Sequence, residues 1–485
     1  MRNWFDYILL HTRTQPEVPA MVMENQIVTY GMLGAAIERC ARRIVALNIP
    51  ATGLVAVRVA NPIRDLILSL ALFRIGMRSI SLAHGQGGVE QFTYAAILGD
   101  RDGARNFDPR ARMVEVTDAW FNEDIPTGGD LPPSFSAGGQ KCRTSLTSGT
   151  TGTPKIVEHS VRGLGRRMTE KLIGCIDVSR SGVLCIPGLS ANFGFTTACA
   201  TLLDGRTVHF VQSPYQALRM IDLLSIDVAI ASADQLLALT RVARKSRAHL
   251  KSLRLVMTGG SILTRALLEA AMIYVCKEIV CHYAASETGA IAQASARDIV
   301  LDPSLVGDVW PGVEVGIFDA NGTRCPVDRV GAVKIRHPDD EELPALVDQP
   351  WFDLGDLGWF ASDGRLHVLG RPIDVDAVNL RDKPSPEVSP VYEVEHLLRL
   401  EWDLTDAAAV LVQDQSGGKP QIWIGVVDNS GASAEKLAAI VRPHGIHYPI
   451  RLFDLHAIPR GANGKVNRQQ LKSQLLSGQA GAGIS

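Results

Sequence analysis

Short apolar runs alternate with segments of helical periodicity along the first part of the chain, and this alternation limits the folds that are possible. Leu54–Val59 has the composition of a strand, and Asp65–Ile75 has that of a helix. A second apolar run lies near Ile80, and Tyr30–Leu47 before them repeats apolar residues at helical spacing. Strands separated by helices predict βαβ units and a largely parallel sheet.

The same pattern resumes further on and then changes. Apolar runs at 183–186, 207–211, 228–230 and 253–257 are expected strands separated by helices. After residue 305, frequent turn signals predict hairpins, and beyond residue 371 helices and strands mix again. The predicted class is α/β, with a large N-terminal domain of α/β sheet subdomains plus a small β-rich subdomain, followed by a small mobile α+β C-terminal domain. We expect domains at 1–371 and 372–477, and a disordered tail at 478–485.

Composition narrows the functional class. The net charge is −2, from 49 basic and 51 acidic residues, which gives no electrostatic reason to expect nucleic-acid binding. No apolar run reaches the roughly 18 residues that a membrane span needs. Eight cysteines without a C-x-x-C pair fit a reducing compartment, so we expect a cytoplasmic protein.

One loop has the composition of a phosphate-binding site. Seven of the nine residues in Thr147–Lys155 are Gly, Ser or Thr, and Lys155 adds a cation. Glycines allow a tight backbone whose N–H groups point inward, an arrangement that suits phosphate oxygens. The spacing differs from the P-loop pattern, and Pro154 stands where its second glycine would be. Taken alone, a loop of this composition is more often an ordinary surface loop than a phosphate site.

Further clusters follow predicted strands, where ligands bind in an open α/β sheet. Gly259-Gly260-Ser261 is one, and His282–Gly289 is another, with an aromatic ring, a hydroxyl and a carboxylate close together. The second is not a nucleophile elbow, because alanine and threonine replace the glycines of G-x-S-x-G. Asp356 lies in a short segment with Gly355 before it and Gly358 two residues after it. Lys465 follows Gly464 near the C-terminus. Each feature alone also fits a solvated turn.

Together these motifs, in this order, resemble the adenylate-forming superfamily of acyl-CoA synthetases, nonribosomal adenylation domains and luciferases. The resemblance extends from Val28 to Arg468 and is closest to the AMP-dependent acyl-CoA synthetases. It implies that a carboxylic acid attacks the α-phosphorus of ATP, and that the resulting acyl-AMP passes its acyl group to a thiol. The cofactors implied are ATP and Mg²⁺, with CoA or phosphopantetheine as acceptor.

The resemblance also implies residue roles. Lys465, Glu287 and Lys155 are the expected catalytic residues, and Glu287 is the expected Mg²⁺ ligand. Tyr283 would stack on adenine, and Asp356 would bind ribose. The expected ATP- and AMP-binding residues are Thr147, Ser148, Gly149, Thr150, Thr151, Gly152, Gly259, Gly260, Ser261, His282, Tyr283, Ala284, Ala285, Ser286, Asp356 and Arg371.

The acyl pocket is the third expected site. Asn192, Phe193 and Gly194 resemble its entrance, with Asn192 where the synthetases often carry histidine. The aspartate that pairs with an α-amino group in amino-acid-activating domains is absent from this segment, so an uncharged carboxylic acid is preferred over an amino acid. Asn379–Pro386 replaces the family's glycine-containing loop beyond the hinge, which leaves the thiol step open.

Several alternatives remain at this level. The chain could load an acyl or peptidyl carrier protein without using free CoA. It could be a nucleotide-binding homologue without catalysis, although binding alone does not require Lys465. A luciferase-like oxygenase would share the first step. The sequence does not identify the acid, the pathway or the oligomeric state.

Overall fold

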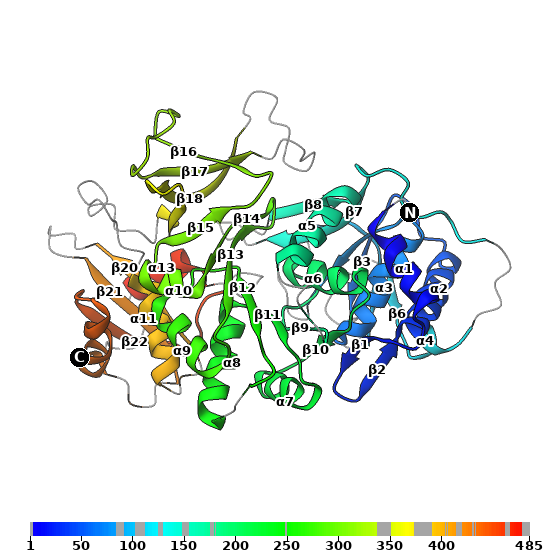
Figure 1. Cartoon of the computed structure of the whole chain (residues 1–485), viewed down its shortest axis with the longest axis horizontal. Helices are drawn as coiled ribbons and strands as arrows, with labels where there is room; N and C mark the ends of the chain where they lie inside the picture. Colours follow the sequence, from blue (N-terminus) through cyan, green and yellow to red (C-terminus); the bar gives the residue numbers. More distant parts are fainter. Residues whose placement is uncertain are drawn as a thin grey trace. The chain divides into compact units, whose positions relative to one another are not determined.

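The computed structural model describes most of the chain, and its contacts divide the chain into two compact units (Figure 1). The described residues are 3–83, 92–101, 112–124, 130–147, 155–174, 179, 181–247, 250–336, 351–372, 390–402, 404, 406–413, 420–428, 431, 433–460 and 466–477, without the side chains of 147 and 155. The first unit comprises Met1–Ala231, Leu250–Val256 and Asp340–Pro344. The second comprises Ser232–His249, Met257–Asp339 and Ala345–Ser485.

The first unit contains a six-stranded sheet in the order β6-β5-β3-β4-β7-β8. Neighbours from β6 to β7 are parallel, and β8 is antiparallel to β7. The strands are β3 (Leu54–Arg58), β4 (Arg78–Ser81), β5 (Tyr94–Gly99), β6 (Met113–Glu115), β7 (Lys141–Thr147) and β8 (Lys155–Ser160). The parallel pairings confirm the βαβ organisation expected from the alternating pattern.

Further strands of the first unit follow the order β11-β9-β10-β1-β2. β11, β9, β10 and β1 pair in parallel, and β2 closes the edge as an antiparallel hairpin with β1. The strands are β1 (Pro19–Met23), β2 (Gln26–Thr29), β9 (Val183–Cys185), β10 (Val208–Phe210) and β11 (Val228–Ser232).

The helices of the first unit begin where the sequence offers a cap. Thr29 accepts a hydrogen bond from the N–H of Met32 at the start of α2, and Asn61 caps α3 with Pro62 at its first position. The helices are α1 (Trp4–Thr14), α2 (Tyr30–Ala46), α3 (Pro62–Arg74), α4 (Ala119–Asn122), α5 (Val161–Gly174), α6 (Asn192–Leu203) and α7 (Pro214–Leu224).

The second unit contains an antiparallel run of strands in the order β13-β14-β15-β19-β18-β17-β16. Its strands from β15 onward form the β-rich subdomain expected after residue 305, and β13 and β14 extend it; the shared core includes Ile291, Val315, Val333 and Leu366. The strands are β12 (Leu255–Gly259), β13 (Ile279–Ala285), β14 (Gly289–Ser295), β15 (Leu305–Val309), β16 (Glu314–Phe318), β17 (Gly331–Arg336), β18 (Phe352–Phe360) and β19 (Leu366–Gly370). The helices are α8 (Ala233–Ser246), α9 (Arg265–Tyr274) and α10 (Ala296–Leu301).

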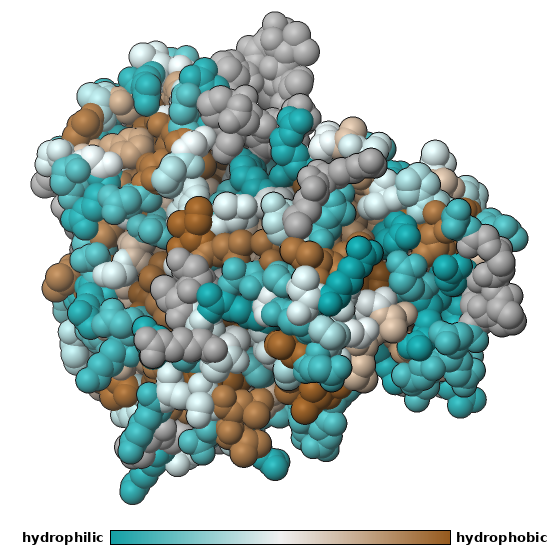
Figure 2. Space-filling model, turned by 45° about the vertical axis from the view of Figure 1, so that its right-hand side comes forward, coloured by the Kyte–Doolittle hydropathy of each residue, from teal (hydrophilic) through white to brown (hydrophobic). Residues whose placement is uncertain are grey.

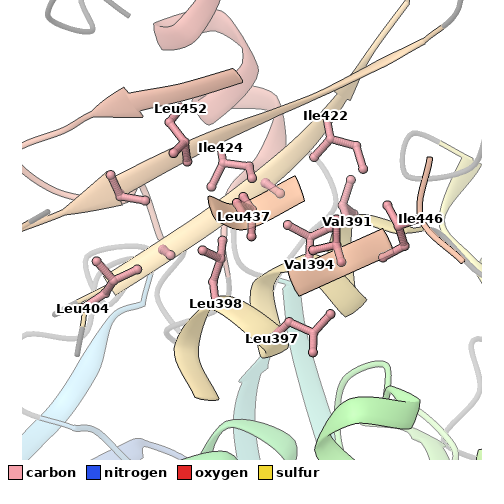
Figure 3. Packing of buried hydrophobic residues seen from close by; sticks show 14 of the residues in the cluster. Val391, Val394, Leu397, Leu398, Leu404, Ile422, Ile424, Leu437, Ile446 and Leu452 are labelled. Atoms are coloured by element: carbon pink, nitrogen blue, oxygen red, sulfur yellow. The ribbon is translucent and has the colours of Figure 1, made fainter. Parts of the chain in front are cut away.

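The C-terminal segment of the second unit is the expected small α+β structure. Figure 3 shows the core in which Leu398 of α11 faces Ile424 of the sheet and Leu437 of α12. Ser433 caps α12 as its hydroxyl position predicts. The elements are α11 (Pro390–Glu401), β20 (Asp406–Val412), β21 (Gln421–Val427), α12 (Ala434–Val441), a 3₁₀ turn (Arg442–His444), β22 (Ile450–Asp454) and α13 (Arg468–Leu476). The predicted boundary after residue 371 stays a prediction.

Helix α11 packs against α9 through polar groups as well as apolar ones. His396 is buried, and its Nδ1 lies 2.8 Å from the hydroxyl of Thr264, the residue that caps α9. The N–H of Ala266 donates to Glu393 over 3.0 Å. At the edge, Arg399 pairs with Asp234 over 2.7 Å. The contact between α11 and α9 therefore depends on buried polar groups, and such groups must stay hydrogen-bonded.

In the view of Figure 2, hydrophilic residues cover much of the surface, and hydrophobic residues gather in patches between them. Across the described ranges, no helix combines the length and the apolar character that a membrane crossing requires.

Candidate active site

The segment from His282 to Gly289 forms a β-hairpin. β13 and β14 pair antiparallel, and Ala285 lies opposite Gly289, which leaves a three-residue connection that contains Glu287. The register shifts between Tyr283 and Ala284, and such a bulge changes the direction of the neighbouring side chains. Gly289 has a φ of 86°, a backbone conformation that side chains disfavour. The clustering was readable in the sequence, whereas the hairpin was not.

Asp356 lies on β18 and is held by two donors. The hydroxyl of Tyr283 donates to its Oδ2 over 2.7 Å, and Nε of Arg371 lies 2.8 Å from its Oδ1. The Asp356 side chain is 14% exposed, so the pair is partly shielded from water. A carboxylate has about four lone-pair positions, and these contacts use two. Asp356 can therefore accept hydrogen bonds from a ligand as well.

The Tyr283 hydroxyl stays protonated in this arrangement. Burial and the negative charge of Asp356 together raise the pKa of Tyr283 well above its ordinary value. The phenol is thus a hydrogen-bond donor at any physiological pH. It orients Asp356 while its ring packs beside the core of the β-rich subdomain.

Arg371 is positioned by the turn at Gly355. It donates through Nη1 to the carbonyl of Leu354 over 2.7 Å. Gly355 has a φ of +74°, and a Cβ there would lie 2.4 Å from the same Nη1. The backbone conformation favours glycine at this position, and a Cβ would force the guanidinium of Arg371 to move.

The loop after β12 lies beside these residues. A Cβ at Gly259 would meet the carbonyl oxygen of His282 at 2.5 Å, so the end of β12 and the start of the hairpin are in direct contact. On the other side, a Cβ at Gly370 would lie 2.9 Å from Cδ1 of Ile262. The structure therefore brings four separate predicted motifs into one neighbourhood of the second unit: 259–261, 282–287, 355–356 and 370–371.

The chemistry of this neighbourhood fits a nucleoside. The ring of Tyr283 can stack on a base, and the carboxylate of Asp356 can accept hydrogen bonds from sugar hydroxyls. The guanidinium of Arg371 and the glycine turn at 259–260 lie beside them. The described residues include no group of three or more side chains of the kind that bind a metal. Glu287 nevertheless fits Mg²⁺, because that ion in phosphate sites uses one or two carboxylates and takes its other ligands from phosphates and water.

The predicted phosphate loop begins and ends on a hairpin of the first unit. β7 and β8 pair antiparallel, with Thr147 opposite Lys155. Ser148, Gly149, Thr150, Thr151 and Gly152 lie outside the described residues, as do the side chains of Thr147 and Lys155. Their expected phosphate contacts stay predictions.

The predicted acyl residues begin helix α6 in the first unit. Gly194 packs so closely on its neighbours that a Cβ would lie 2.4 Å from the carbonyl oxygens of Pro187 and Gly188. Asn192 and Phe193 retain some exposure. Nζ of Lys171 on α5 lies 4.4 Å from the centroid of the Phe193 ring. Sequence reasoning missed Lys171, because nothing in its local context distinguishes it from a solvated helix lysine.

Arg143 is a second missed residue of the first unit. It is buried on β7, donates to the carbonyl of Leu189 over 2.7 Å and to Ser81 over 2.9 Å, and stacks on Phe195 at 3.5 Å. Burial lowers the pKa of Arg143, and the negative charge of nearby Asp65 opposes that shift. Arg143 thus links the strand before the phosphate loop to the start of α6. The only sequence signal was a charged residue inside a β-prone run.

Lys465 and the rest of 461–465, together with the altered loop 379–386, lie outside the described residues. The residues on either side of the lysine segment are fixed to β20. Arg460 forms a bidentate ion pair with Asp406 and a β-bridge with Val466. Arg468 pairs with Glu395 over 2.5 Å and donates to the carbonyl of Ala409.

Comparison with protein families and curated proteins agrees with this arrangement. Residues 132–339 match the family model described as AMP-binding enzyme. A "4-coumarate--CoA ligase-like 6" from Oryza sativa subsp. japonica is 27% identical over 301 residues, which are 59% of this chain and 49% of that protein. A "Fatty acid--[acyl-carrier-protein] ligase ScoC" from Streptomyces coeruleorubidus is 25% identical over 353 residues, 68% of this chain and 66% of that protein. The chain thus aligns with about half to two thirds of these relatives.

Solved structures match over a longer range. An O-succinylbenzoate coenzyme A synthetase from Bacillus subtilis, in complex with AMP, superposes with a TM-score of 0.77 at 20% identity and covers 97% of this chain and 98% of its own. At that identity the similarity establishes the fold: a large α/β assembly of sheets and helices followed by a smaller C-terminal part.

Proposed function

We propose that this chain is a member of the adenylate-forming superfamily, which the match of residues 132–339 to the AMP-binding enzyme family model supports. In this proposal it activates a carboxylic acid with ATP and then transfers the acyl group to a thiol. One observation carries the proposal most directly. Tyr283, Asp356 and Arg371, which are far apart in sequence, form a connected group beside Gly259. These are the residue types and positions at which the superfamily binds the nucleoside.

In the first step, a carboxylate oxygen of the acid attacks the α-phosphorus of ATP. The bond between that phosphorus and the bridging oxygen breaks, acyl-AMP forms, and pyrophosphate leaves. Negative charge gathers on phosphate oxygens, so positioned cations and N–H groups lower the barrier. We assign this role to Lys155, Lys465 and the 147–152 loop.

The nucleoside is held by the second unit in this proposal. Asp356 accepts hydrogen bonds from the ribose hydroxyls, and Tyr283 and Arg371 fix the carboxylate so that its free lone pairs point in a constant direction. The Tyr283 ring offers its face to adenine, next to Gly259, Gly260 and Ser261. Glu287 would hold Mg²⁺, which when bound neutralises charge on the phosphate oxygens.

In the second step, the sulfur of a thiol attacks the acyl carbonyl. A thioester forms, AMP leaves with the bonding electron pair, and the thiol proton is released. CoA and a phosphopantetheine arm are both compatible acceptors. A cytoplasmic location is part of the same proposal.

ATP–pyrophosphate exchange over a panel of carboxylic acids, with amino acids included, tests the first step. We expect exchange that depends on a particular acid. Exchange independent of any acid, or none with the whole panel, would contradict the proposal. A thioester assay with free CoA and with a pantetheinylated carrier protein then identifies the acceptor.

A further inference from the structure

One buried guanidinium contacts the chain on both sides of the predicted acyl residues. Arg143 on β7 is 3% exposed, and its Nη2 donates to the carbonyl of Leu189 over 2.7 Å. Its guanidinium carbon lies 3.5 Å from the centroid of the Phe195 ring, within the range of a cation–π contact. Leu189 precedes Asn192 by three positions, and Phe195 directly follows Gly194. A single side chain therefore holds both ends of the segment that contains the expected acyl residues.

The segment between these two contacts is packed against itself. A Cβ at Gly194 would lie 2.4 Å from the carbonyl oxygens of Pro187 and Gly188. The thiol of Cys185, at the end of β9, also donates to the carbonyls of Pro187 and Gly194. Because the turn before α6 and the first turn of α6 are in such close contact, a displacement of Leu189 would shift the predicted acyl residues as well.

The other contacts of Arg143 fix it inside the six-stranded sheet. Nη2 also donates to the hydroxyl of Ser81 on β4 over 2.9 Å, and that hydroxyl donates to Asp65 on α3 over 2.6 Å. Asp65 is 6% exposed and accepts from Ser69 over 3.2 Å, so its carboxylate is held as well. Its negative charge is the counter-charge of the buried guanidinium. Arginine suits this position because its planar fork can bond at its edges and stack on a ring at once.

Arg143 also lies close to the predicted phosphate loop. It precedes Thr147, the last residue of β7 and the first of the loop, by four positions. β7 lies between β4 and β8 in the sheet, so its backbone is hydrogen-bonded on both sides. A buried ion pair adds little stability beyond that of well-packed apolar residues. What this network supplies is a fixed geometry between the strand that leads into the phosphate loop and the acyl segment.

We propose that Arg143 is a positioning residue for the acid substrate: it fixes the segment 189–195 relative to the end of β7, so that the reacting carboxylate is aligned with the phosphates of ATP. This inference rests on the proposed function and adds a residue to its acid site. Alignment matters, because a misplacement of about 1 Å can lower a rate by about a hundredfold. Asp65 and Ser81 act one step further out, by holding the guanidinium.

Two variants of Arg143 test this role. Arg143→Lys keeps the charge beside Asp65, but an ammonium cannot bond the carbonyl and the hydroxyl in the same fork while it stacks on the ring. Arg143→Met combined with Asp65→Asn removes both charges, which avoids an unpaired buried carboxylate. Arg78→Lys is the matched control, because Arg78 lies on the adjacent strand β4 with a 35% exposed side chain that pairs with Glu158.

Pyrophosphate release is measured with the carboxylic acid that gives the fastest exchange in the wild type, once with the acid varied and once with ATP varied. Both Arg143 variants should raise KM for the acid about tenfold or more and leave KM for ATP within about twofold. Arg78→Lys should match the wild type. A loss of folded protein alone would lower kcat and leave both KM values unchanged, and that result would overturn the inference. Equal rises of the two KM values, or wild-type values in both variants, would overturn it too.

Amide hydrogen exchange of the full-length protein supplies a readout that needs no turnover. Exchange within 189–195 should be faster in Arg143→Lys than in the wild type, with no change in the sheet of β20, β21 and β22. Unchanged exchange within 189–195 would contradict the inference. Faster exchange there, in a protein that releases no pyrophosphate with any acid, would instead count against the proposed function and leave the anchoring of the segment by Arg143 supported.

Discussion

The hydroxyl of Tyr283 donates a hydrogen bond to Oδ2 of Asp356 over 2.7 Å, although 73 positions separate the two residues. The bond joins the hairpin of β13 and β14 to the centre of β18. It also joins two residues with distinct expected roles, one at the base and one at the sugar of a nucleotide. Since Arg371 holds the other oxygen of the same carboxylate, a change at any of the three alters the other two.

Asp356→Asn should raise KM for ATP about tenfold, because a hydrogen bond from a ligand to a charged group contributes roughly 1.5–3 kcal/mol. Tyr283→Phe keeps the ring and should have a smaller effect. Pyrophosphate release at varied ATP concentration measures both. The double variant should fall short of the product of the single effects, since the two groups are in contact.

Asp363→Asn is the matched control for Asp356→Asn, because Asp363 lies in an exposed turn where it pairs with Arg365. It should leave KM for ATP unchanged. A wild-type KM in Asp356→Asn would remove Asp356 from the nucleotide site.

Gly355→Ala should act on the same carboxylate indirectly. The new Cβ would displace the guanidinium of Arg371, since it would lie 2.4 Å from Nη1, and the backbone φ of +74° adds strain. We expect a raised KM for ATP and a loss of stability of about 1 kcal/mol or more. Gly364→Ala, with a similar φ but open space around it, separates the two effects, because it should lower stability without changing KM.

Lys465→Ala should lower the adenylation rate about a hundredfold or more, by analogy with the loss of one preorganised donor in a transition state. ATP–pyrophosphate exchange measures this directly. Lys472→Ala, on the following helix, is the control and should retain the wild-type rate. Exchange at the wild-type rate in Lys465→Ala would refute the assignment.

Glu395→Ala should destabilise the protein by about 3–5 kcal/mol, because it leaves Arg468 without its carboxylate in a largely buried site. The two side chains are only 9% and 11% exposed. Denaturant unfolding gives the free-energy difference. Breaking the pair of Arg244 and Glu401, which is about 40% exposed, should cost under about 1 kcal/mol and serves as comparison.

Acid should weaken the contact of α11 with α9 through His396. Burial, assisted by the positive charge of Arg399, lowers the pKa of His396 to about 4, from 6.5 in the unfolded chain. Between these values the unfolded state binds more protons, so stability is complete above pH 6.5 and falls as pH decreases towards 4. From pH 7 to pH 5 the loss attributable to His396 is about 2 kcal/mol.

Replacement of this histidine tests the assignment. His396→Gln should be less stable than the wild type at pH 7, because packing is lost, but should lose less stability on going to pH 5. Denaturant unfolding at the two pH values measures the difference. An unchanged pH dependence would show that His396 does not control it.

Much of this fold could be predicted from local patterns, because burial imposes them. Leu54–Val59 was readable as a strand, since its apolar residues are buried in the sheet. The order of strands was not readable, because pairing between β15 and β19 depends on packing across distant segments.

The candidate site could likewise be predicted only in part: its residues were found from the sequence, and their contacts were not. Gly259, Tyr283, Asp356 and Arg371 were found because their types and order form motifs. Their mutual contacts were not, since the bond from Tyr283 to Asp356 is set by the bulge in β13 and by the turn at Gly355. Lys171 and Arg143 were missed because their burial depends on tertiary packing, which the local sequence does not reveal.

The β-bridge between Arg460 and Val466 has a consequence for how a catalytic lysine could be delivered. Lys465 directly precedes Val466 in the sequence, and Arg460, the partner of Val466 in the bridge, is ion-paired with Asp406 of β20. If these contacts persist, a large movement of Lys465 would also move the sheet formed by β20, β21 and β22. A probe attached to an exposed site on that sheet would then report the lysine's position throughout turnover.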